Sequence, residues 1–210
     1  MTMYDFLIDL DDFFCEKYAN YDKLCILPGY KMPMMQASEV REDGRTYAYT
    51  LPAETMRLGL QEKKAELLTE LKTRMVDTTF SFSFRIHGFW ARKKAWFSKY
   101  GFYKLLKQVL AKYDFTDENV LEQIEIAPEV WKGICKNKFL PTKNLIFSLA
   151  LAAHMSLDDT VALLNQCGYL LDYAVVKDVV IAYLLGNKVY NRPMVDAALA
   201  EYKVSNLFLK

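Results

Sequence analysis

Few side chains in this sequence of 210 residues have the types and spacing that catalysis or metal binding requires. The two histidines, His87 and His154, each lack a serine, cysteine or carboxylate at a spacing known from nucleophilic or metal sites. The eight glycines are scattered and form no phosphate-binding loop. The four cysteines have no zinc or redox spacing, so we expect reduced, mostly buried thiols. They are Cys15, Cys25, Cys135 and Cys167. The sequence therefore predicts no enzyme, cofactor, metal or small-molecule ligand, although residues far apart in sequence can still assemble a site.

Basic and aromatic side chains are concentrated between residues 78 and 113. This segment has eight basic and no acidic residues, whereas the whole chain has a formal net charge of +1. Such a segment suits a phosphate backbone with stacked bases, or an acidic protein surface. The alternative is a linker and a first helix whose aromatics are core and whose lysines face water. The basic residues are Arg85, Arg92, Lys93, Lys94, Lys99, Lys104, Lys107 and Lys112.

A strongly acidic stretch follows directly and contains no basic residue. Its carboxylates are Asp114, Asp117, Glu118, Glu122, Glu125 and Glu129. Thr116 is a good first residue for a helix, with early carboxylates against the positive end of the helix dipole. Pro128 is tolerated in a first helical turn, so it indicates the start of a second short helix. The spacing predicts a helix-turn-helix arrangement.

The stretch from Phe115 to Pro141 resembles the lambda-repressor-like (XRE, Cro/CI-type) helix-turn-helix family. The similarity extends over about residues 102–169 and implies five consecutive helices, the first rich in apolar residues at helical spacing. The last two should begin at Thr142 and at Ser156, which pairs with Asp159 as in a capping box. The positions that match the family without a gap are Thr116, Val120, Ile124, Ile126, Ile134 and Pro141.

The departures from the family affect the surface that would read DNA. DNA-reading members commonly have glutamine after the threonine, glycine in the turn and polar or basic residues at the start of the third helix. This chain has Asp117, Glu125 and Glu129 there. Because DNA affinity rests largely on lysine and arginine, an acidic leading edge opposes it. Later side chains can still reach phosphate or bases, namely Lys132, Lys136, Asn137 and Lys138.

The residues before this module predict a small α+β domain. An amphipathic first helix has Asp5, Asp9, Asp12 and Glu16 on its polar face. A solvated or partner-facing surface is a better interpretation of this face than a metal site, because cation sites usually draw carboxylates from several elements or a shaped loop. Its apolar face would contain Tyr4, Phe6, Leu7, Leu10, Phe13, Phe14 and Tyr18.

A hairpin around Asp43-Gly44, a helix over 52–75 and an alternating strand over 78–86 that could join the hairpin complete this domain. We expect a mainly α protein with three parts. These are a small α+β domain at 1–88, a basic aromatic connector at 89–101 and an all-helical domain of about seven helices at 102–210.

The last part of the chain predicts two further helices. One contains Val175 to Leu184 and should end at Gly186-Asn187, and Asn191 should cap the other, with Pro193 in its first turn. This region is similar to the tail of a helical module in poorly characterised bacterial proteins. The similarity implies an accessory or sensing module and a bacterial source, and no catalytic residue.

Two functions follow from these features. The first is a non-enzymatic regulatory or adaptor protein that binds a protein partner, or itself, through a degenerate helix-turn-helix domain. Its docking edge would be Asp117, Glu118, Glu122, Glu125 and Glu129. The second is a DNA-binding transcriptional regulator that contacts phosphate through the basic 85–107 segment and the 132–138 helix. The sequence shows neither a signal peptide nor a spanning segment, so we expect a cytoplasmic protein without a membrane partner.

Overall fold

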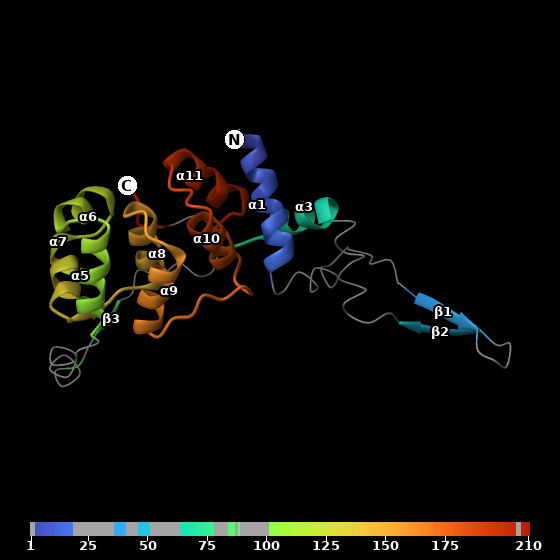
Figure 1. Cartoon of the computed structure of the whole chain (residues 1–210), viewed down its shortest axis with the longest axis horizontal. Helices are drawn as coiled ribbons and strands as arrows, with labels where there is room; N and C mark the ends of the chain where they lie inside the picture. Colours follow the sequence, from blue (N-terminus) through green and yellow to red (C-terminus); the bar gives the residue numbers. More distant parts are fainter. Residues whose placement is uncertain are drawn as a thin grey trace. The chain divides into compact units, whose positions relative to one another are not determined.

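A computed structural model gives the fold of the chain (Figure 1). It describes residues 3–18, 36–40, 46–50, 64–77, 84–86, 88, 101–204 and 207–210. In these residues the protein is mainly helical with one small hairpin near its start, which confirms the predicted fold class. The chain forms two compact units. The first comprises Met1–Met75 with Tyr173–Val175, and the second comprises Val76–Asp172 with Val176–Lys210.

In the first unit, helix α1 (Met3–Lys17) contacts helix α3 (Lys64–Arg74). The Lys72 ammonium donates hydrogen bonds to both carboxylate oxygens of Asp11, at 2.8 and 3.0 Å. Tyr4, which we expected on the apolar face of α1, is 73% exposed. The buried face is narrower than expected because α1 packs along a single stripe. That stripe is Phe6, Leu10, Phe14, Cys15 and Tyr18, and α3 adds Leu68 and Leu71.

The predicted hairpin is confirmed. Strand β1 (Gln36–Val40) pairs antiparallel with β2 (Thr46–Thr50), and Ser38 lies opposite Ala48. The Asp43-Gly44 turn and the first part of the helix expected over 52–75 lie outside the described residues.

The strand expected over 78–86 is described only from Phe84, and it does not pair with the hairpin. Strand β3 (Arg85–Ile86) pairs antiparallel with β4 (Phe139–Leu140), which lies later in the second unit. The division between the units therefore precedes this strand, at Met75, whereas we expected a boundary near residue 88. Strand alternation predicts a buried face but does not identify the strand that pairs with it.

Seven helices were expected from residue 102 onward, and in the described residues the second unit has them. They are α5 (Phe102–Lys112), α6 (Asp117–Gln123), α7 (Pro128–Cys135), α8 (Lys143–Ala152), α9 (Leu157–Gln166), α10 (Val176–Gly186) and α11 (Arg192–Glu201). In Figure 1, α5, α6 and α7 lie side by side, with α8 and α9 between them and α10. Helices α8 and α10 are buried over almost their whole length and form the core, as all-round apolar helices do.

Side chains begin three of these helices as their sequences predicted. The Thr116 hydroxyl accepts the Asn119 backbone N–H, and the Asn119 side chain accepts the Thr116 N–H, in a capping box. The Thr142 hydroxyl caps α8 by accepting the Leu145 backbone N–H. Ser156 accepts the Asp159 backbone N–H at 3.2 Å, which confirms the predicted pairing. Asn191 precedes α11, but its side chain makes no capping hydrogen bond, so this prediction was wrong in part.

In the described residues, six helices are followed by a residue with left-handed backbone, and only one of these six residues is glycine. After α9, the Gly168 N–H donates to the Asn165 carbonyl and the Tyr169 N–H to the Leu164 carbonyl, each at 2.9 Å, and Gly168 has φ of 72°. This is a Schellman motif. Helix α10 ends at Gly186, as expected, and the same kind of reversal follows at Lys188. The other reversals are at Asp114, Asn137, His154 and Lys203.

No helix in the described part of the chain is both long enough and apolar enough to span a membrane.

Candidate functional site

The five carboxylates expected to form a docking edge lie on the outer surface of α6, of α7 and of the turn between them. We call Asp117, Glu118, Glu122, Glu125 and Glu129 the acidic edge. All five residues are exposed. In the described part of the chain, none of them forms an ion pair with a lysine or arginine. The edge therefore presents uncompensated negative charge to solvent.

Asp117 differs from the other four because its carboxylate binds a side chain of α7. It accepts a hydrogen bond from the indole N–H of Trp131 at 3.1 Å, and Trp131 is buried. The Tyr103 hydroxyl and the Cys135 thiol interact beside this pair. Burial, and next the Asp117 charge, raise the pKa of Cys135 to about 11. This cluster joins α5, α6 and α7, and its thiol is protonated at neutral pH.

At the amino-terminal end of α6, side chains of the same segment accept hydrogen bonds from the backbone N–H groups. Thr116 and Asn119 form the capping box described above. The Glu118 carboxylate adds to it, because hydrogen bonds from Thr116 and from its own backbone N–H lower its pKa. Helix amino-termini are common phosphate-binding points in proteins that bind DNA. Here that point already holds a carboxylate.

The basic residues singled out from the sequence do not have a single common role. Arg85 donates a hydrogen bond to the Cys167 carbonyl, and its guanidinium lies 4.7 Å from the centre of the Tyr169 ring. It therefore attaches β3 to the end of α9. Asn137 is half-buried with φ of 52° and ends α7. The lysines are exposed on α5 and on or after α7, namely Lys104, Lys107, Lys132, Lys136 and Lys138. Arg92, Lys93, Lys94 and Lys99 lie outside the described residues.

The segment 207–210 runs along the turn between α6 and α7. The Glu125 N–H donates to the Phe208 carbonyl at 2.6 Å, and the Lys210 N–H donates to the Gln123 carbonyl at 3.0 Å. Ile124 and Leu209 form an antiparallel bridge. The turn between α6 and α7 is thus one side of an isolated antiparallel β-bridge.

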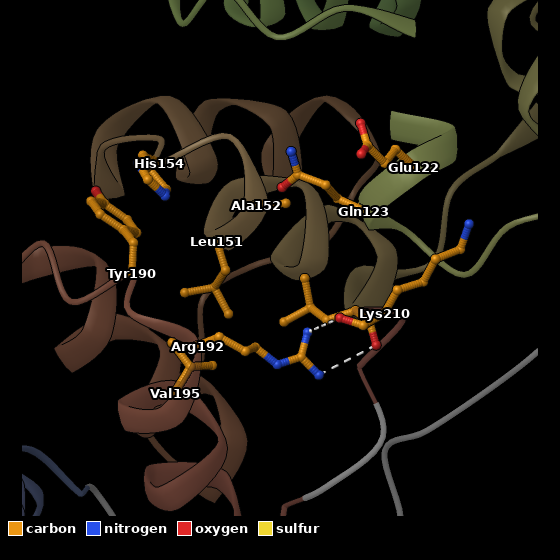
Figure 2. A pocket seen from close by; sticks show the side chains of 10 residues that line it. Glu122, Gln123, Leu151, Ala152, His154, Tyr190, Arg192, Val195 and Lys210 are labelled. Atoms are coloured by element: carbon orange, nitrogen blue, oxygen red, sulfur yellow. Dashed lines mark hydrogen bonds between the residues drawn. The ribbon is translucent and has the colours of Figure 1, made fainter. Parts of the chain in front are cut away.

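Arg192 is the first residue of α11 and holds residues 207–210 in place. Its guanidinium donates to both Asp196 carboxylate oxygens at 2.8 and 2.9 Å. It also donates to the Lys210 carbonyl at 2.7 Å and to the Leu209 carbonyl at 3.4 Å (Figure 2). The Arg192 charge is therefore compensated, and its main donors are already bonded.

Next to Arg192 and the last residues of the chain is a pocket of about 240 Å³. Its walls come from the ends of α6 and α8, from the start of α11 and from the last residues of the chain (Figure 2). Leu151, Ala152 and Val195 give it apolar surface. His154 and Tyr190 form another wall, with their rings stacked at 4.6 Å and an interplanar angle of 13°. Glu122 belongs both to this pocket and to the acidic edge.

The sequence did not predict this pocket, although Glu122 and His154 were considered. Its lining residues are scattered over four segments, and no local pattern shows that residues 207–210 return to the α6–α7 turn. The only local signal was the isolated His154 at the end of an apolar helix. Its imidazole forms part of a wall, which its sequence neighbours could not indicate.

The described residues give little support for nucleophilic or metal chemistry. They contain no group of three or more histidine, cysteine or acidic side chains arranged to hold a metal ion. Burial raises the pKa of the Cys167 thiol to about 12, above that of Cys135. Both thiols are therefore protonated at neutral pH, and a protonated thiol is a poor nucleophile.

Comparison of the chain with protein-family models, curated proteins and solved structures finds no match, so the lambda-repressor-like resemblance remains a prediction.

Proposed function

We propose that this chain is a regulatory or adaptor protein that binds a protein partner through a degenerate helix-turn-helix domain. The observation that carries this proposal is the acidic edge, whose exposed carboxylates have no cationic partner in the described part of the chain. Unpaired charge on one edge attracts a surface of opposite charge and speeds its association. The partner is therefore a protein with a basic surface.

The start of α6 supports a protein partner over DNA. In a helix-turn-helix reader, the first helix of the motif crosses the backbone and the second enters the major groove. Here the start of α6 presents Glu118, and the first turn of α7 presents Glu129. Each places a negative charge where a phosphate would approach, and DNA affinity requires the opposite charge.

A DNA-binding regulator is the second candidate, and one contact favours it. The interaction between Tyr103 and Cys135 brings α5 against α7. Exposed lysines on these helices, Lys107 and Lys132 among them, then belong to neighbouring elements. In this proposal the basic residues of the 85–107 segment, which include Lys107, and those of the 132–138 helix would contact phosphate together.

Reversing one charge on the acidic edge tests the first proposal. Glu122→Lys should weaken binding to a partner isolated with the full chain at least tenfold, and raised salt should weaken wild-type binding, since the Debye length is only about 8 Å at 0.15 M. Glu66→Lys is the matched control, because Glu66 is also exposed but lies on α3. Isothermal titration calorimetry measures both. Equal binding by the two variants contradicts the proposal.

A direct DNA measurement separates the two candidates. Fluorescence anisotropy with a mixed-sequence duplex at about 0.1 M salt should show no binding by the wild-type chain, because the acidic edge repels phosphate. Salt-sensitive binding that Lys132→Glu abolishes would support the DNA-binding regulator instead.

A further inference from the structure

We infer that the pocket in Figure 2 receives an arginine side chain of the protein partner and so anchors that partner beside the acidic edge. This inference rests on the proposed function and names the chemistry of the contact. The volume of about 240 Å³ is the first reason for a side chain. Pockets for free small-molecule ligands are usually roughly 300–1,000 Å³, so this one suits a single protruding group.

The polar groups that remain available in the pocket favour a hydrogen-bond donor. In the described part of the chain, the Glu122 carboxylate, the Gln123 amide and the His154 imidazole make no side-chain hydrogen bond. The other polar groups are already bonded. The Tyr190 hydroxyl donates to the Met155 carbonyl at 2.7 Å. A carboxylate together with an amide oxygen accepts the several N–H groups of a guanidinium.

The two cations of the lining already have hydrogen-bond partners of their own. Arg192 is neutralised by Asp196 and bonded to two carbonyl groups. The Lys210 ammonium donates to the Leu121 carbonyl, and in Figure 2 its side chain points away from His154. The carboxyl end of α8 also lies at the pocket through Leu151 and Ala152, and a helix carboxyl end carries partial negative charge.

The stacked rings favour arginine over lysine. His154 and Tyr190 form a flat wall, and His154 is exposed. A planar guanidinium stacks on aromatic surfaces, whereas an ammonium is a compact and strongly hydrated point charge. The apolar surface of Leu151 and Val195 suits the methylene stem of the same side chain.

Titration with a model side chain tests the site without the partner. The probe is N-acetyl-L-arginine amide, and the neutral control is N-acetyl-L-norleucine amide. In 15N-resolved NMR spectra the arginine probe should shift the backbone amides of Gln123, His154 and Lys210, with a Kd of about 1 mM given the usual ligand efficiency. The norleucine probe should not. Absence of these shifts, or equal shifts with both probes, overturns the inference.

Two variants locate the contact. Glu122→Gln should weaken arginine binding at least threefold, while Glu66→Gln, which removes an exposed carboxylate of α3 outside both the pocket and the acidic edge, should leave it unchanged. Equal Kd values for these two variants overturn the inference. Ala152→Leu should fill the pocket, abolish the shifts caused by the arginine probe and weaken partner binding at least tenfold.

Partner binding distinguishes failure of the inference from failure of the proposed function. If Glu122→Lys weakens partner binding and a folded Ala152→Leu protein does not, the edge binds the partner and the pocket does not. If neither Glu122→Lys nor Ala152→Leu weakens partner binding, the proposed function also fails. Because Glu122→Gln conserves the size of the side chain, its affinity for the arginine probe tests the inference even if Ala152→Leu disturbs α8.

Discussion

Asp117 has a different role from the carboxylates that follow it, although the sequence places them on one edge. It bonds the Trp131 indole and fixes α6 against α7, whereas Glu122 faces solvent and the pocket. Arg85 likewise holds an element in place instead of remaining available for a partner. Residue types predicted the charge of the surface well. They could not predict which charged groups bond internally, because that depends on residues far away in the sequence.

Gly133 provides a prediction at the residue scale. It lies in α7 against the ring of Phe139, and a Cβ there would collide with that ring. Gly133→Ala should therefore lower the free energy of unfolding by about 1–3 kcal/mol, as overpacking does. Gly186→Ala is the control, because nothing lies within 4 Å of its Cβ position. It should be neutral, or stabilising by up to about 1 kcal/mol. Urea unfolding measures both, and equal losses contradict the prediction.

Helix starts were predictable from the sequence, whereas most of the left-handed reversals after the helices were not. Thr116, Thr142 and Ser156 begin helices through local hydrogen bonds that depend on neighbours three residues away. Five of the six left-handed reversals lack the glycine that usually marks them, and Lys188 is one example. The helix-turn-helix spacing predicted α6 and α7 correctly. It could not reveal that their turn forms a β-bridge with Leu209.

The contact between α5 and α9 gives a prediction about pH. Asp159 accepts hydrogen bonds from Lys112 at 2.7 Å, Tyr113 at 2.5 Å and Ser156 at 3.0 Å. Burial alone would raise the pKa of Asp159, but these three donors outweigh it, and the pKa is lowered. A carboxyl whose pKa is lower in the folded state stabilises the fold above its unfolded pKa of about 3.9. That stabilisation is lost as pH falls through the folded value.

Asp159→Asn should therefore lower the free energy of unfolding by about 1–2 kcal/mol at pH 7, and the gap to the wild type should shrink below about pH 4. Urea unfolding across this range measures it. Tyr113→Phe should have a smaller effect in the same direction, and the double variant should lose less than the sum. A gap that stays constant with pH contradicts the assignment.

At the scale of the whole molecule, composition and periodicity predicted a mainly helical chain with an N-terminal hairpin. The division between units at Met75 was less predictable, because it depends on which element receives the strand around Arg85. A buried ion pair explains part of this division. Lys177 of α10 pairs with Asp77 at 2.6 Å, and the two side chains are 1% and 5% exposed.

This ion pair anchors the start of the second unit, and its loss should be costly. Lys177→Met leaves Asp77 buried without its countercharge and should lower the free energy of unfolding by about 3–5 kcal/mol. The double variant Lys177→Met/Asp77→Leu should recover most of that loss. Thermal and urea unfolding measure both. Lys72→Met, which removes a less buried pair with Asp11, should cost less. A double variant as unstable as the single one contradicts this account.

The pairing of residues 207–210 with the α6–α7 turn also bears on translation. Domains generally fold from the amino end as they emerge from the ribosome. Here the Phe208 carbonyl accepts the Glu125 N–H, and the Phe208 N–H donates to the Ser148 hydroxyl. Phe208 is synthesised after the helices of the second unit. We therefore expect a released chain truncated before Phe208 to form its helices but to lack these two hydrogen bonds at the α6–α7 turn and at Ser148.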